Sequence, residues 1–258
     1  MDISLRDPAV AGAFYPGTAA ALERDLRRLI AVSADRHPLL ACIAPHAGYV
    51  YSGGVAGALY GHLELPQRVI VLGPNHTGAG AAVAVAPHRR WRTPLGDVPI
   101  DTALARKLVD RAWAATFDPR AHLREHSLEV QLPFLLARRP DLEVLPVCLA
   151  HLRLEDCLDL GRVVARLIAD QAEPVGIVAS SEFTLNWVIA RLEDLTNQTR
   201  EEAWRDRPPH ATFGGGHTAD HVPEVGPLEA ERGATFRAMQ AFQGPFYPMV
   251  NTPGEVHL

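Results

Sequence analysis

The fold of this chain is constrained most strongly by an alternation between short apolar runs and longer amphipathic patterns. Four runs are typical of buried strands: residues 39–43, 68–72, 142–149 and 175–179. Between them, apolar side chains recur at helical spacing, as Leu22, Leu26 and Leu29 do after Thr18, a residue type that suits a helix N-cap. Strands that alternate with helices predict an α/β fold, with a mostly parallel or mixed central sheet and helices on both faces.

The other elements are predicted from weaker local signals. A Gly-rich turn is expected at Ser52-Gly53-Gly54. Residues 54–63, 101–113, 127–136 and 154–168 are expected to be helices, and residues 81–86 a further strand. The stretch 87–99 contains Pro and Gly and is expected to be a loop. We expect one α/β domain over residues 1–200, followed by a divergent segment, 201–258, in which Pro and Gly residues break every regular period.

Composition and charge bear on the class of protein. The chain has 258 residues, of which 47% are hydrophobic, and a net charge of −5. This charge gives no reason to expect nucleic acid binding, and no apolar run approaches the roughly 20 residues of a membrane-spanning helix. Acidic residues near the N-terminus argue against a secretory signal, and the three cysteines form no Cys-x-x-Cys pair. We therefore expect a cytoplasmic protein with reduced thiols.

Residues that can bind a metal follow three of the predicted strands. His46 follows the first strand, His76 the second, and Glu182 comes after Ser180-Ser181 at the end of the last. Sites in α/β sheets form beyond the carboxyl ends of strands, and two histidines with one carboxylate are typical of non-haem Fe(II) centres. In the alternative interpretation, each histidine is bonded to backbone, and Glu182 is a general base or a carboxylate at a helix N-terminus.

Other candidates surround these residues. His126 lies in the polar cluster Arg124-Glu125-His126-Ser127, at an expected helix start, where a neutral imidazole would suit acid–base catalysis. In the alternative, Ser127 caps the helix and His126 is exposed. The phenol of Tyr49 could donate a hydrogen bond to a bound oxyanion, or its ring could pack in the core. Asn75 and Arg124 complete the expected substrate contacts.

Several motifs occur together and in a fixed order. They are AVAGAFYPG ending at Gly17, APHAGY (residues 44–49), GPNH (73–76), RTPLG (92–96), EHSLE (125–129), Leu132-Pro133, LPV (145–147) and SSEF (180–183). In this respect the chain resembles the MEMO protein family, known in prokaryotes as AmmeMemoRadiSam system protein B. The resemblance covers about residues 8–185.

The resemblance implies a fold similar to that of the class III extradiol dioxygenases, which use non-haem iron. It implies that His46 and His76 line a metal pocket, with His126 and Glu182 in or near it. Fe(II) or Cu would be the cofactor of a redox reaction on an unknown small molecule. Other family members are described as phosphopeptide-binding adaptors. The resemblance also implies a functional link to radical SAM and AMMECR-type proteins.

The chain departs from the family pattern at three points. Glu182 stands where the family usually has Asp, the histidine of the Ser-Ser-Asp-x-x-His pattern is missing, and no cysteine follows Cys157. These differences weigh against complete metal coordination. Three hypotheses follow: a metal-dependent oxidoreductase, a binding module that holds a peptide or anion in the same pocket without turnover, and an inactive member.

Overall fold

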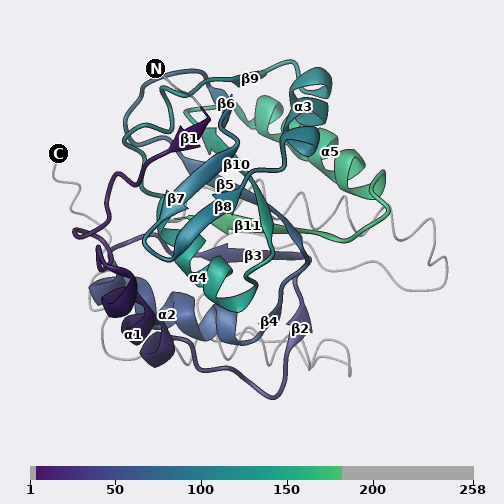
Figure 1. The fold of residues 1–258 in the computed structure, drawn as a ribbon. Coiled ribbons are helices and arrows are strands. Elements are labelled where there is room, and N and C mark those ends of the chain that lie inside the picture. The colour runs from purple at the N-terminus through teal and green to yellow at the C-terminus, as the bar shows by residue number, and fades with distance from the viewer. Residues whose placement is uncertain (1–3, 182–258) are drawn as a thin grey trace, which may run out of the picture. The chain divides into compact units, whose positions relative to one another are not determined.

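The computed structural model describes residues 4–181 (Figure 1). The predicted domain boundary near residue 200 and the divergent segment after it lie outside the described residues. Within the described part, none of the helices has the length and apolar character needed to cross a membrane.

A six-stranded mixed sheet forms the centre of the described residues (Figure 1). Its strands lie in the order β3 (Ala41–Ala44), β11 (Val175–Ser180), β5 (Arg68–Pro74), β10 (Glu143–Leu149), β6 (Val83–Val85) and β9 (Ala115–Phe117). The first four strands are parallel, β6 is antiparallel to β10, and β9 is parallel to β6. The predicted α/β fold with a mixed sheet is confirmed.

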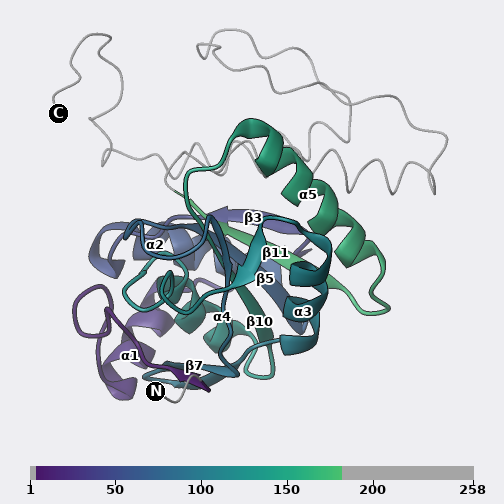
Figure 2. The same ribbon diagram turned by 90° about the horizontal axis from the view of Figure 1, so that it is seen from above.

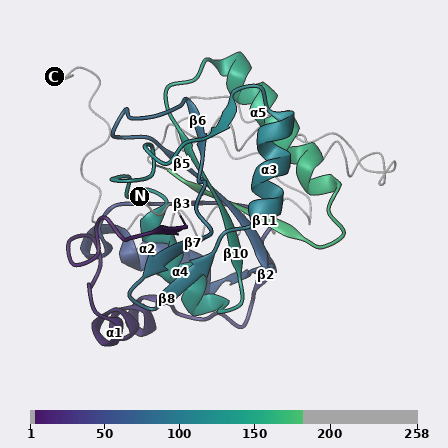
Figure 3. The ribbon, with the colours of Figure 1, turned by 45° about the horizontal axis from the view of Figure 1, so that its top comes forward.

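Helices cover both faces of this sheet. On one side lie α1 (Ala19–Leu29), α2 (Tyr49–Gly61) and α4 (Leu132–Arg138), and on the other α3 (Thr102–Arg111) and α5 (Leu154–Ala169) (Figures 2 and 3). Successive side chains along each strand point to alternate faces of the sheet, so they belong to alternate cores. Val69 and Val71 of β5 belong to the first core, whereas Ile70 and Leu72 belong to the second. The continuous apolar runs of the sequence thus reflect strands that are buried on both faces.

Residues 90–99 form a hairpin, so the loop predicted over residues 87–99 was wrong there. Strands β7 (Arg90–Thr93) and β8 (Gly96–Pro99) pair antiparallel, and β1 (Leu5–Arg6) joins β7 to complete a small sheet. Trp91 and Thr93 are buried while Arg90 and Arg92 are exposed, which is the alternation of a half-buried strand. Arg6 packs its guanidinium over the Trp91 ring. A second small sheet pairs β2 (His37–Pro38) with β4 (Leu63–Glu64).

Helix α2 begins at Tyr49, earlier than the sequence indicated. The glycines that suggested a turn lie inside the helix, where they permit close contact with the segment after α1. A Cβ on Gly57 would lie 2.2 Å from the carbonyl oxygen of Leu29, and one on Gly61 would lie 2.0 Å from that of Ala31. The helix start follows the first histidine loop directly, and this brings residues 46–48 close to the sheet edge.

Candidate metal centre

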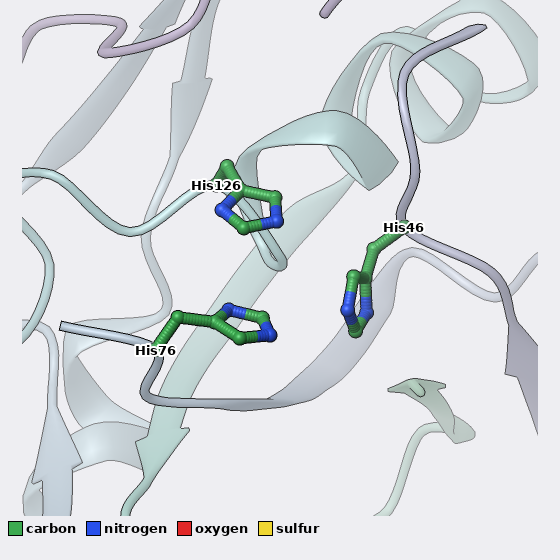
Figure 4. Close-up of side chains that lie close together, drawn as sticks. All are labelled: His46, His76 and His126. Atoms are coloured by element: carbon green, nitrogen blue, oxygen red, sulfur yellow. The ribbon is translucent and has the colours of Figure 1, made fainter. Parts of the chain in front are cut away.

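Three histidines converge beyond the carboxyl ends of the parallel strands. His46 follows β3, His76 follows β5, and His126 belongs to the loop before the 3₁₀ turn η1 (Glu129–Gln131) (Figure 4). Each offers one ring nitrogen, and these atoms all lie within 4.8 Å of one another. The rings of His76 and His126 stack with centroids 4.6 Å apart, and the His46 ring stands edge-on to both.

The sheet and one loop determine this convergence. Strand β11 lies between β3 and β5, and Ser180 at its end pairs with Ala44. The loop with His126 is tied to the same edge, because the Ser127 hydroxyl donates to the Pro74 carbonyl at 2.9 Å. The Ser180 hydroxyl in turn donates to the Ser127 carbonyl at 2.6 Å. The ends of two strands and the His126 loop are therefore linked by hydrogen bonds.

His76 is oriented by the buried carboxylate of Glu125. The carboxylate accepts a hydrogen bond from Nδ1 of the His76 ring at 2.8 Å. It also accepts hydrogen bonds from the backbone N–H groups of His76, His126 and Ser127. Burial raises the pKa of Glu125, but the Ser127 and His76 donors outweigh it and hold that pKa below its ordinary value. An ionised Glu125 keeps the proton of a neutral His76 on Nδ1, which leaves a lone pair on Nε2.

His46 is oriented by neutral partners. The Ser180 hydroxyl gives its single proton to Ser127 and accepts a donor from Gln131 at 2.8 Å. It lies 3.3 Å from Nδ1 of His46 and can only accept there. Gln131 is held in turn by the Pro45 carbonyl and the Tyr60 hydroxyl. A neutral His46 therefore carries its proton on Nδ1 and presents the Nε2 lone pair.

His126 completes the cluster from a loop rather than from a helix start. Its ring packs against Phe14 on one side and His76 on the other, and its side chain is 22% exposed. The helix expected to begin at Ser127 begins at Leu132, after η1. Pro133 near the first turn favours that later start because it has no N–H to donate. Ser127 therefore bonds to the strand end instead of capping the helix.

The remaining predicted residues lie in different environments. Tyr49 packs in the core, and its hydroxyl donates to the Val130 carbonyl at 2.8 Å. The Asn75 side chain holds its own turn, accepting from Thr77 and Gly78 and donating to the Ala79 carbonyl. Arg124 is exposed. Glu182 lies outside the described residues, so its predicted roles as ligand and base stay predictions.

Sequence reasoning missed the residues that support the histidines. Glu125 belongs to the EHSLE motif and Ser180 to the SSEF motif, but the sequence predicts no contact of either residue, or of Gln131, with a histidine. Glu129, the second acid of EHSLE, fixes the N-terminal loop by pairing with Arg6 and accepting from Tyr15 and Val10. The signal that could have revealed Glu125 was the density of polar residues around it, because buried polar groups need partners.

The donor set fits a transition-metal ion. Neutral imidazoles suit Fe, Zn, Cu and Ni, and centres with three protein ligands leave a position for another molecule. His46 is buried, whereas the His76 side chain is 41% exposed. The centre is thus anchored on one side and open on the other. Among the described residues, the clustered donors include no carboxylate.

Fold and site together define an α/β protein with a candidate three-histidine metal centre at the carboxyl ends of its strands. The sequence profile of the Memo-like protein family matches residues 6–204, and the chain belongs to this family. A MEMO1 family protein of Methanosarcina mazei is 37% identical over 198 residues, covering 76% of this chain and 73% of the relative. One of Aquifex aeolicus is 40% identical over 183 residues, covering 70% and 67%. The predicted family membership is confirmed.

Proposed function

We propose that His46, His76 and His126 hold one transition-metal ion, Fe(II), and that the protein is a metal-dependent oxidoreductase. One observation carries the proposal: three ring nitrogens lie within 4.8 Å of one another. The hydrogen bonds of Ser180 and Glu125 support it, because they leave Nε2 of His46 and His76 available as ligand atoms.

When bound, the metal would supply Lewis-acid and electron-transfer chemistry. The residues of the chain would hold the metal and orient its ligands and the substrate. Glu125 keeps the proton on Nδ1 of His76, and Ser180 does the same for His46. The exposed edge of His76 gives a small-molecule substrate access to the centre. Arg124 is the nearby cation proposed to attract an anionic substrate. His126 has a second proposed role in acid–base catalysis, and Glu182 is proposed as a further ligand or base.

Three parts of the proposal are supported by the sequence resemblance. They are the likeness to class III extradiol dioxygenases, the use of Fe(II) or Cu, and the functional link to radical SAM and AMMECR-type proteins. A cytoplasmic location has separate support, because Cys42, Cys148 and Cys157 are all free thiols.

A second candidate function is binding without turnover. A centre with only neutral ligands leaves the full charge of its cation for an anionic group, such as a carboxylate of a peptide. The three imidazoles that cluster within residues 4–181 are uncharged donors of this kind, and they are the observation that favours this alternative. Both functions require the metal.

Metal loading of the full-length chain tests the shared requirement. Protein purified without oxygen and incubated with Fe(II) is expected to bind close to one ion per chain, and His46→Ala and His76→Ala are expected to abolish this binding. His37→Ala, an exposed histidine on β2, is the matched control and should bind like wild type. Equal, low metal content in wild type and His46→Ala would refute the proposal.

Reactivity of the loaded protein separates the two functions. The oxidoreductase is expected to consume O₂ or to oxidise its iron in a substrate-dependent way that His46→Ala abolishes. The binding module is expected to change the spectrum of the bound metal when an anion is added, with no net oxidation.

A further inference from the structure

A second concave site lies away from the histidines. A groove of about 670 Å³ is formed by the segment between β6 and β7, the end of β8, the first turns of α3 and Phe117 of β9. Such a volume is typical of small-molecule pockets. Ile100 on its wall bridges to Val144, at the beginning of β10, whereas the histidines lie beyond the carboxyl ends of β3 and β5. The groove is therefore separate from the metal centre.

Three guanidinium groups line this groove: Arg89, Arg90 and Arg106. All three side chains are exposed, and the described residues offer none of them an ion pair or side-chain hydrogen bond. Many other arginines are paired, as Arg111 is with Asp170 and Arg120 with Asp118. None of the described residues that line the groove is acidic. The neighbouring carboxylate of Asp101 is committed to Arg68 and to the Leu104 N–H.

The backbone that carries these arginines is fixed. The N–H groups of Arg89 and Arg90 donate to the Ser4 carbonyl at 2.8 and 3.1 Å, and the Ile100 N–H donates to the Arg89 carbonyl at 2.9 Å. Arg106 lies on helix α3. Less ordering is needed to bring their side chains together on an anion when the supporting backbone is already held.

Apart from Thr102, the other described residues that line the groove are apolar. Ala86, Ile100 and Ala105 are buried beneath it, and Phe117, which is 41% exposed, lies at its side. A ligand that matches such a lining has an anionic head for the arginines and a flat apolar body for Phe117. Carboxylates and phosphates both accept two parallel hydrogen bonds from a guanidinium group, but a phosphate monoester matches three such groups better because it carries three acceptor oxygens and a charge near −2.

We propose that the groove lined by Arg89, Arg90 and Arg106 binds a small organic phosphate monoester with an aromatic or other flat apolar body. The phosphate lies among the three guanidinium groups, and the body packs against Phe117. The site works without the metal and without the three histidines.

Calorimetric titration of the full chain with phenyl phosphate tests this proposal. His46→Ala is used as the background, so that binding at the metal centre does not contribute. We expect saturable binding that Arg89→Gln and Arg106→Gln each weaken about tenfold, as the loss of a charge-assisted hydrogen bond would. Arg24→Gln, which removes an exposed arginine from α1, is expected to leave the affinity unchanged.

Two comparisons test the ligand class. Inorganic phosphate is expected to bind at least tenfold more weakly than phenyl phosphate, and phenol is expected not to bind. The proposal is overturned if phenyl phosphate does not bind at millimolar concentration, or if Arg89→Gln and Arg106→Gln bind it like wild type. Equal affinity for phosphate and phenyl phosphate would refute the apolar part of the ligand.

Discussion

At the scale of single residues, the central feature is how the three clustered histidines, the proposed ligands, are held. His46 and His76 could be identified from sequence because each follows a short apolar strand. Glu125 could not be assigned to His76, because the two residues are 49 positions apart and meet only when the loop folds over the end of β5. His126 was predicted near the pocket, but only the folded chain brings its ring nitrogen within reach of the other two.

Replacing Glu125 tests the role of that carboxylate. In Glu125→Gln, an amide donor would face the N–H groups that the carboxylate now accepts, and Nδ1 of His76 would lose its charged partner. We expect metal affinity to fall by about 10–100-fold and the free energy of unfolding to fall by about 1–3 kcal/mol. Metal titration and urea denaturation measure the two effects.

Glu173→Gln is the control for this change, since Glu173 is exposed in the segment between α5 and β11, at the end of β11 opposite to the one that approaches the histidines. It is expected to alter neither quantity. A metal affinity of Glu125→Gln equal to that of wild type would show that Glu125 does not orient a ligand.

At the scale of elements, sequence patterns predicted the parallel strands and helices α1, α3 and α5 well, because their apolar periods are long. They failed where local chemistry and tertiary packing disagree. The Ser52-Gly53-Gly54 stretch suggested a turn, yet it lies within α2 because the chain after α1 approaches this helix too closely for side chains. The hairpin at 90–99 was missed because its strands are short and Pro94 interrupts the pattern.

Two glycines of α2 provide a matched test of that packing. Gly57→Ala would place a Cβ 2.2 Å from the Leu29 carbonyl oxygen, so the two segments must separate. We expect a loss of about 1–3 kcal/mol in the free energy of unfolding, as for overpacked cores. At Gly54 nothing lies within 4 Å of an added Cβ, so Gly54→Ala is expected to stabilise by about 0.5–1 kcal/mol. Urea denaturation measures the free energy of unfolding of both variants. A value for Gly57→Ala equal to that of wild type would contradict the close contact.

At the scale of the whole molecule, stability is expected to depend on pH through a buried histidine. His122 packs beside Trp91 and donates its Nε2 proton to the Ala84 carbonyl at 3.1 Å. Burial, and then the neighbouring His88, lower the pKa of His122 from 6.5 to about 3. The folded state therefore binds fewer protons than the unfolded state between these two values.

The sign of the effect follows from linkage. The contribution of His122 is fully present above about pH 6.5 and is lost as the pH falls towards 3, at up to about 1.4 kcal/mol per unit. His122→Asn, which cannot titrate, is expected to flatten this part of the curve of unfolding free energy against pH. An unchanged slope in the variant between pH 6 and 4 would mean that another group causes the loss of stability at low pH.

The central claim, that three histidines form one metal centre, is tested most directly by X-ray absorption of the Fe(II)-loaded, full-length protein. The account predicts imidazole scattering from three ligands at about 2.0–2.2 Å, reduced in His126→Ala as well as in His46→Ala and His76→Ala. The same spectrum in His126→Ala and wild type would contradict the three-histidine centre.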